Sequence, residues 1–185
     1  MRWIFVNNEF FEEDKAVVKA GDLALQRGYG VFDFFRTKNN KPLFLDDYLD
    51  RFFNSASEMF ITIPLPREAL KKIIYELIEK NKLPESGIRI TATGGYSPDG
   101  YLPSQANIIM QQQPLTMPPA EKYKQGMKII THEYLRDLPS IKSINYLMGV
   151  WLQKKLKAMQ ADDVLYFKNN IISEFSAAYT RQQCA

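Results

Sequence analysis

The chain has 185 residues, of which 45 % are hydrophobic and 13 % aromatic, so it is long enough for one large or two small domains and is not of the disordered class. Its formal net charge is only +3 and both signs are interspersed, which argues against a nucleic-acid-binding surface. The single cysteine, Cys184, excludes a disulfide framework within the chain, and we find neither a signal peptide nor an apolar run that could span a bilayer, so we expect a cytoplasmic protein.

The first part of the chain predicts antiparallel strands followed by a helix. Strands are expected at residues 3–6, 10–11, 16–18 and 31–37, with a hairpin return over 41–45 after Asn39-Asn40. Asp46 is placed to cap a helix that runs to about Phe60. The residues that would form the apolar face of this helix are Tyr48, Leu49, Phe52, Phe53, Ala56, Met59 and Phe60.

A second helix is expected from Pro66 to about Lys82, because proline is tolerated at the start of a helix. Its predicted buried residues are Leu70, Ile73, Ile74, Leu77 and Ile78. Further expected elements are strands at 88–93, 107–112, 127–132, 164–167 and 171–174 and a helix at 144–159.

This mixture of antiparallel strands and segregated helices predicts an α+β fold. The proline-containing stretch 114–121 reads as a linker. We therefore expect a small N-terminal α/β domain of residues 1–113, with antiparallel strands and two helices, and a partial C-terminal domain of residues 122–185 that carries Lys142.

Several common catalytic motifs do not fit the sequence. Gly28-x-Gly30 lacks the third glycine of a dinucleotide fingerprint, and neither a phosphate-binding lysine loop nor a Gly-x-Ser-x-Gly turn occurs. The one histidine, His132, lies in an expected strand and is interpreted as structural. With one histidine and one terminal cysteine, we expect no metal site.

Lys142 is the residue with the most distinctive setting. It lies between two apolar residues, just before the helix expected from Ile144, where the positive end of the helix dipole would disfavour the ammonium form. A neutral lysine amine suits Schiff-base formation with an aldehyde cofactor. From position alone, a surface lysine in a loop remains the commoner interpretation.

Two further residues would complete such a site. A cofactor of the pyridoxal phosphate type also needs a group that controls its ring nitrogen and donors for its phosphate. Glu174 could supply the first and Arg51 the second, since a planar guanidinium suits a phosphate dianion. Taken singly, Arg51 could be a surface partner of Asp47, and Glu174 could end an exposed strand.

Five segments in order carry a resemblance to a known family. They are Gly21-Asp22 with Arg27–Arg36, then Phe44–Ala56, Ile88–Gly95, Lys142–Leu147 and Ile172–Ser176. Together they resemble the class IV aminotransferases, of pyridoxal phosphate fold type IV. The resemblance covers residues 3 to about 176, which is nearly the whole chain.

The resemblance implies a role for each candidate. Lys142 matches the lysine that binds pyridoxal 5′-phosphate and moves a proton between the amino acid Cα and the cofactor. Glu174 matches the carboxylate at the pyridine nitrogen, and Arg51 the arginine at the phosphate. Tyr146 is one residue out of register with a tyrosine that, in branched-chain members, lies near the phenolic oxygen of the cofactor. Phe32 falls where branched-chain members place a pocket-lining phenylalanine.

The reaction implied is transfer of the amino group of an L-amino acid, of branched-chain type, to a 2-oxo acid by a homodimer. D-amino-acid members carry a tyrosine at the Phe32 position, and basic residues where this chain has Asp99 and Tyr101. A 4-amino-4-deoxychorismate lyase, which shares the lysine and the glutamate, is the alternative enzyme.

The tail departs from the family pattern after about Ser176. Tyr179 stands where an asparagine is expected, and residues 180–183 replace an apolar strand. We therefore expect a C-terminally truncated member with weakened cofactor binding and little turnover. A folded remnant that catalyses nothing is the non-enzymatic alternative.

Overall fold

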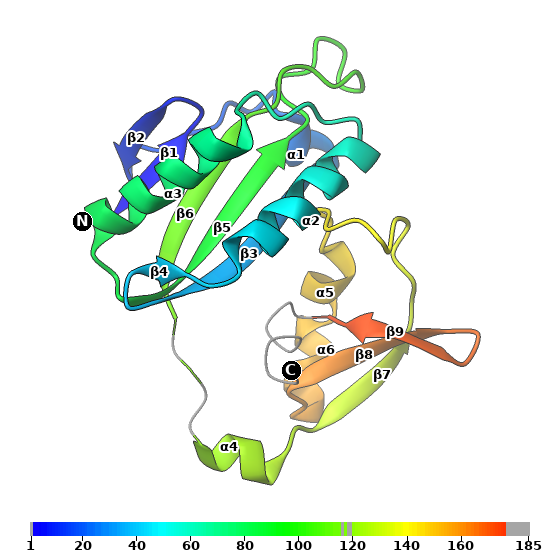
Figure 1. Ribbon diagram of the computed structural model, residues 1–185. Coiled ribbons are helices and arrows are strands. Elements are labelled where there is room, and N and C mark those ends of the chain that lie inside the picture. The colour runs from blue at the N-terminus through cyan, green and yellow to red at the C-terminus, as the bar shows by residue number, and fades with distance from the viewer. Residues whose placement is uncertain (1, 116, 118–119, 177–185) are drawn as a thin grey trace. The chain divides into compact units, whose positions relative to one another are not determined.

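The computed structural model describes residues 2–115, 117 and 120–176 (Figure 1). They form two compact units. The first contains the described residues of Met1–Thr116 together with Ser140–Asn145, and the second contains those of Met117–Pro139 and from Tyr146 onward. The domain limits expected from sequence stay a prediction, and the departures noted at Tyr179 and at 180–183 lie outside the described residues. No helix in the described ranges is long and apolar enough to cross a membrane.

A six-stranded antiparallel sheet forms the centre of the first unit, with the order β2-β1-β6-β5-β3-β4. The strands are β1 (Trp3–Val6), β2 (Glu9–Glu12), β3 (Gly30–Lys38), β4 (Lys41–Pro42), β5 (Glu85–Thr93) and β6 (Ile108–Pro114). The longest pairing joins β3 and β5, from Gly30 opposite Thr93 to Lys38 opposite Glu85. This pairing gives the most regular part of the sheet, and the candidate site lies beside it.

Two long helices lie side by side across one face of this sheet (Figure 1). The helices of the first unit are α1 (Leu23–Arg27), α2 (Leu45–Glu58) and α3 (Arg67–Asn81). The core between α2, α3 and the sheet includes the fully buried side chains Leu49, Phe52, Leu70, Ile74, Leu77, Phe35, Ile88 and Ile90. Each such side chain stabilises the fold by about 1.5–3 kcal/mol of transfer free energy. The predicted apolar faces of both helices are confirmed in this core, except at Phe60.

A buried polar cluster fixes one end of the sheet. The Asp22 carboxylate caps α1 by accepting a 2.7 Å hydrogen bond from the Ala24 N–H. Its other oxygen accepts from the Thr93 hydroxyl at 2.7 Å and from the Asn107 side-chain amide at 2.6 Å. Asp22, Thr93 and Asn107 are all buried. The cluster therefore joins α1, which the sequence did not predict, to the end of β5 and the residue before β6.

Three expectations for the first unit are wrong. Residues 16–18 form no strand, and Val17 is 74 % exposed, so the apolar pattern there has no sheet partner. Asp46 does not cap α2, because the helix begins at Leu45 with Phe44 as its N-cap. Asp46 lies in the first turn instead, where its negative charge still suits the helix dipole. Phe60 lies beyond the end of α2 and is exposed rather than part of its apolar face.

The second unit contains a three-stranded sheet with the order β7-β8-β9. Its elements are α4 (Ala120–Gln125), β7 (Ile129–Glu133), α5 (Leu147–Trp151), α6 (Gln153–Met159), β8 (Asp163–Lys168) and β9 (Ile171–Phe175). The pair β7–β8 is parallel and the pair β8–β9 is antiparallel. A small core of Ile130, Leu152, Leu156, Val164 and Tyr166 holds α5 and α6 against the sheet.

The last helix differs from the expectation for residues 144–159. It begins three residues later, at Leu147, and consists of two short helices that meet at the buried Leu152. The late start has a local cause, because the Ile144 N–H donates to the Gly30 carbonyl and so continues a β-type pairing. The α+β class is confirmed, since the strands are largely antiparallel and the helices are segregated from them.

Candidate functional site

The Lys142 segment is an extra extended strand beside β3. The Phe32 N–H donates to the Lys142 carbonyl at 2.9 Å, and the Ile144 N–H donates to the Gly30 carbonyl at 3.0 Å. On its other side, the Lys142 N–H donates to the Ser55 hydroxyl of α2 at 3.2 Å. The main chain of the lysine is thus fixed by both the sheet and the helix.

Close backbone approach requires glycine at Gly30. A Cβ at this position would lie 2.8 Å from the Ala92 carbonyl oxygen and 3.0 Å from the Ile144 side chain. Any larger residue would therefore clash first with the main chain of β5 and would also displace the end of the Ile144 side chain. The second glycine of Gly28-x-Gly30 is explained by this contact rather than by a dinucleotide.

The helix from which a dipole effect on Lys142 was expected begins at Leu147, five residues after the lysine, rather than at Ile144. The Lys142 amine lies instead 5.1 Å from the centroid of the Phe32 ring. An aromatic face attracts a cation, whereas the N-terminus of a helix would repel one.

Phe32 is fully buried on β3 and has a second cation against it. The guanidinium carbon of Arg89, on β5, lies 4.0 Å from the centroid of the Phe32 ring. Phe32 pairs with Thr91, two residues along β5 from Arg89, so the two side chains share one face of the sheet. Sequence reasoning did not single out Arg89. The ring thus has two basic side chains around it, which makes this part of the sheet suited to anionic ligands.

Arg51 is held by a buried carboxylate rather than by Asp47. Its Nε donates to Asp33 at 2.8 Å and its Nη2 donates to the other Asp33 oxygen at 2.6 Å. Asp33 on β3 is fully buried and also accepts from the Phe34 N–H at 2.7 Å. A bidentate pair of this kind fixes the plane of the guanidinium. Arg51 precedes Ser55 by one helical turn, so both reach the same side of α2 as the lysine strand.

Two of the candidate site residues, Glu174 and Tyr146, lie in the second unit. Arg136 donates to both Glu174 oxygens, from Nε at 2.5 Å and from Nη2 at 3.2 Å. These side chains are only 13 % and 14 % exposed, although the three residues that precede Glu174 on β9 are exposed. Arg136 also donates to the Pro139 carbonyl at 3.2 Å. Tyr146 is the N-cap residue of α5 and has no side-chain capping bond.

The structure therefore brings Lys142, Phe32 and Arg51 together in the first unit, and Glu174 together with Arg136 in the second. Sequence reasoning missed Asp33, Ser55, Arg89 and Arg136. A signal existed for Arg136, since a carboxylate that becomes buried requires a cation or several donors. Asp33, Ser55 and Arg89 are identified only by contacts between strands and helices that are distant in sequence. The sequence motifs carry no information on those contacts.

Comparison with known proteins gives one family. The family described as "Amino-transferase class IV" matches residues 30–178. A D-alanine aminotransferase of Staphylococcus epidermidis is 28 % identical over 178 residues, which are 94 % of this chain and 63 % of the relative. A protein of Methanocaldococcus jannaschii, provisionally named a branched-chain-amino-acid aminotransferase, is 32 % identical over 155 residues, which are 80 % of this chain and 53 % of that protein.

A solved structure shows the same fold. It is a branched-chain amino acid aminotransferase from T.th. with pyridoxamine 5′-phosphate, and it is similar at a TM-score of 0.84 and 21 % identity. The similarity covers 95 % of this chain and 63 % of that one. The chain thus spans less than two thirds of the length of each of these three proteins.

Proposed function

Because the chain belongs to the class IV aminotransferase family, we propose that it is a pyridoxal-phosphate-dependent aminotransferase in which Lys142 carries the cofactor. The observation that carries this proposal is the setting of Lys142. Its main chain is fixed by Phe32 and Ser55, and its amine lies 5.1 Å from a buried ring. A fixed nucleophile gains the rate advantage of orientation. The pyridoxamine phosphate in the T.th. structure supports the same cofactor here.

The side-chain chemistry of Arg51 and of Glu174, each taken by itself, suits this cofactor. A phosphate dianion suits a guanidinium whose plane is fixed, and Arg51 is fixed by Asp33 on the same side of α2 as the lysine strand. A ring nitrogen suits a carboxylate that stays ionised, and Arg136 provides two charge-assisted hydrogen bonds to Glu174. When bound, pyridoxal phosphate supplies an aldehyde for amines and a ring that accepts electrons.

Each candidate residue of the chain would then have its own role in the reaction. The Lys142 amine would bind the cofactor as a nucleophile and would later take and return the proton at the amino acid Cα. Arg51 would orient the cofactor through its phosphate, and Glu174 would hold the ring nitrogen protonated. Phe32 would line the pocket, and Tyr146 would lie near the phenolic oxygen.

For the substrates, we propose an L-amino acid of branched-chain type as the donor and a 2-oxo acid as the acceptor, with a homodimer as the assembly. The Methanocaldococcus jannaschii relative supports this choice. So does Asp99, whose carboxylate accepts hydrogen bonds from the Leu102 and Tyr101 N–H groups, which lower its pKa. An anion that stays charged would repel a substrate carboxylate, whereas D-amino-acid members are expected to have basic residues at Asp99 and Tyr101.

The test is the visible absorption spectrum of the 185-residue chain after pyridoxal phosphate is added, followed by borohydride trapping and mass mapping. We expect an absorption band and a label on Lys142. The Lys142→Ala variant should lose the band and the label at that site. Lys154→Ala, at an exposed position of α6, is the matched control and should keep both.

The outcomes separate the alternatives. Labels scattered over surface lysines in the wild-type chain, with no band, would contradict cofactor binding at Lys142 and favour a non-catalytic remnant. If the label is at Lys142, assays with L-leucine, D-alanine and 4-amino-4-deoxychorismate follow. We expect amino transfer from L-leucine. Transfer from D-alanine alone, or release of an aromatic amine from the chorismate derivative, would overturn the proposed substrate.

A further inference from the structure

Ser55 is a buried polar residue on the core side of α2. It is 3 % exposed, and its neighbour Ala56, which belongs to the first-unit core, is 1 % exposed. Alanine is a better helix former than serine, and a buried hydroxyl costs free energy unless it is hydrogen-bonded. The Ser55 oxygen accepts a hydrogen bond from the Lys142 N–H at 3.2 Å. The lysine segment therefore explains why a hydroxyl stands at this position of the helix.

The hydrogen bond to Ser55 lies where the pairing between the lysine segment and β3 would otherwise continue. Val31 and Ser143 face each other in this antiparallel pairing, so the next residues along, Phe32 and Lys142, are placed to exchange two hydrogen bonds. The first of these bonds, from the Phe32 N–H to the Lys142 carbonyl, is present at 2.9 Å. The Lys142 N–H donates instead to the Ser55 hydroxyl. Ser55 thus determines where the main chain of the lysine leaves the sheet.

The same helix carries the arginine that we propose as the phosphate-binding residue. Arg51 precedes Ser55 by four residues on α2, which corresponds to a rise of about 6 Å along the helix. The Arg51 guanidinium is fixed by two hydrogen bonds to Asp33. In pyridoxal phosphate, the aldehyde and the phosphate-bearing arm are attached to neighbouring ring carbons, so the ring sets their separation. A single helix that anchors both Arg51 and the lysine segment would set a matching separation in the protein.

We propose that Ser55 is a positioning residue, which holds the Lys142 main chain so that its amine meets the aldehyde of a cofactor whose phosphate is bound at Arg51. In this attachment the neutral Lys142 nitrogen forms a bond to the aldehyde carbon, and the aldehyde oxygen leaves as water with the two amine hydrogens. Ser55 acts only by limiting the positions of the nucleophile, and orientation of this kind raises reaction rates. The inference rests on the proposed function, because it takes Lys142 as the attachment residue.

The rate at which Lys142 becomes labelled tests this role. The full chain is mixed with saturating pyridoxal phosphate and quenched with borohydride after increasing times, and the label on Lys142 is quantified by mass mapping. We expect Ser55→Ala to slow this labelling roughly tenfold, because a displaced nucleophile loses the advantage of orientation. The variant should still fold, since alanine is the better helix former.

Pyridoxamine phosphate separates a positioning role from damage to the fold. It has an amine in place of the aldehyde, so it cannot be attached to Lys142, but its phosphate would still bind at Arg51. We expect Ser55→Ala to leave the dissociation constant for pyridoxamine phosphate unchanged. Hydrogen exchange without any cofactor gives a second measurement. In Ser55→Ala, the protection of backbone amides should fall in residues 140–145 and should stay unchanged in β3 and β5.

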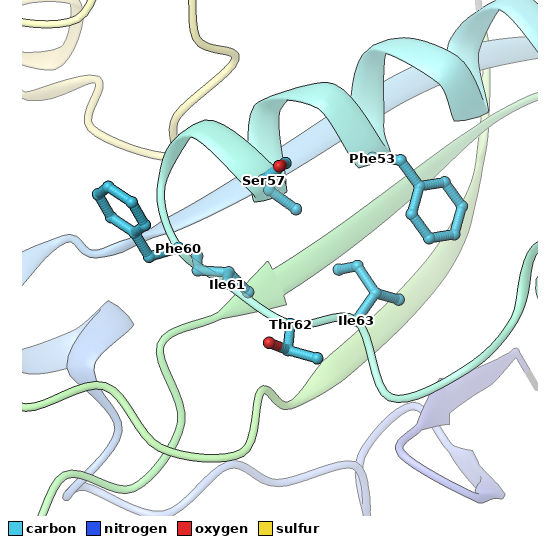
Figure 2. Close-up of a pocket in the computed structure, with 7 residues that line it drawn as sticks. Phe53, Ser57, Phe60, Ile61, Thr62 and Ile63 are labelled. Carbon is cyan, nitrogen blue, oxygen red and sulfur yellow. The ribbon is translucent and has the colours of Figure 1, made fainter.

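Ser57→Ala is the matched control. Ser57 is an exposed serine two residues after Ser55 on the same helix. Figure 2 shows it beside the hollow at the end of α2, which is lined also by Phe53, Thr62 and Ile63. The control variant should therefore keep the wild-type labelling rate, dissociation constant and amide protection.

Each other outcome overturns the inference. Labelling of Ser55→Ala at the wild-type rate would show that the hydroxyl does not position the lysine. Slower labelling together with weaker binding of pyridoxamine phosphate, or equal slowing in Ser57→Ala, would give Ser55 a structural part only. These results leave the proposed function standing. A wild-type chain that is not labelled at Lys142 overturns the proposed function and this inference together.

Discussion

Replacing Arg136 with methionine is expected to lower the free energy of unfolding of the second unit by roughly 3 kcal/mol. Arg136 and Glu174 are both nearly buried, and the change removes two charge-assisted hydrogen bonds to the Glu174 carboxylate. Breaking a buried pair from one side leaves a charge that water reaches poorly, which costs more than the pair itself contributes. The effect is large for a unit whose core, among the residues that the structure describes, consists of five buried side chains.

Hydrogen exchange followed by mass spectrometry is the measurement, because it resolves the two units. In the variant, the protection of backbone amides from exchange should fall in β8 and β9 and should stay unchanged in β3 and β5. The double variant Arg136→Met/Glu174→Leu should recover part of the loss, since it removes the buried charge as well. Equal protection of β9 in wild type and Arg136→Met would contradict a stabilising role for the pair.

Replacing Asp22 with alanine is expected to lower the free energy of unfolding of the first unit by about 3 kcal/mol, summed from a lost helix cap and from unsatisfied buried donors. The Ala24 N–H, the Thr93 hydroxyl and the Asn107 amide would all lose their acceptor. Each buried donor without a partner costs about 1–3 kcal/mol, although neighbouring losses do not add fully.

Urea unfolding at neutral pH measures this change, with Asp46→Ala as the matched control. Asp46 is also an aspartate at the start of a helix, but it is exposed and its main partner is Lys71, whose hydrogen bond lowers the pKa of Asp46. Exposed pairs of this kind contribute little, so the control should unfold near the wild-type midpoint. If both variants shift the urea midpoint equally, the hydrogen bonds of Asp22 contribute no more to the free energy of unfolding than an exposed ion pair does.

Periodicity was sufficient for the long elements of the fold. The apolar residues of α2 and α3 recur at helical spacing, and β3 and β5 are rich in branched and aromatic residues. The errors fall where local patterns and tertiary pairing disagree. Val17 and Val18 have a strand-like pattern but no partner strand, and Ile144 begins an apolar helical pattern but pairs with Gly30. Short α1 depends on an aspartate cap whose other partners lie far along the chain.

The candidate site was predictable as a list of residues but not as an arrangement. The motifs supplied Lys142, Arg51, Glu174, Tyr146 and Phe32 through a family resemblance, and their roles remain proposals. The partners that fix these residues were not predictable. Asp33 could be recognised as the partner of Arg51 only after β3 and α2 were packed together, and sequence distance alone favoured Asp47.

The attachment of the lysine strand to β3 and α2 has a consequence for the order of folding. The hydrogen bond between the Lys142 N–H and Ser55 closes a loop of 87 residues, and the pairing with Phe32 closes a longer one. Loop closure costs conformational entropy that grows with loop length, and contacts of high sequence separation form slowly. The sheet and α2 can assemble from residues that precede the lysine. The nucleophile therefore reaches its position only after its scaffold exists, and the sheet and α2 of a nascent chain can fold before the Lys142 segment completes the first unit.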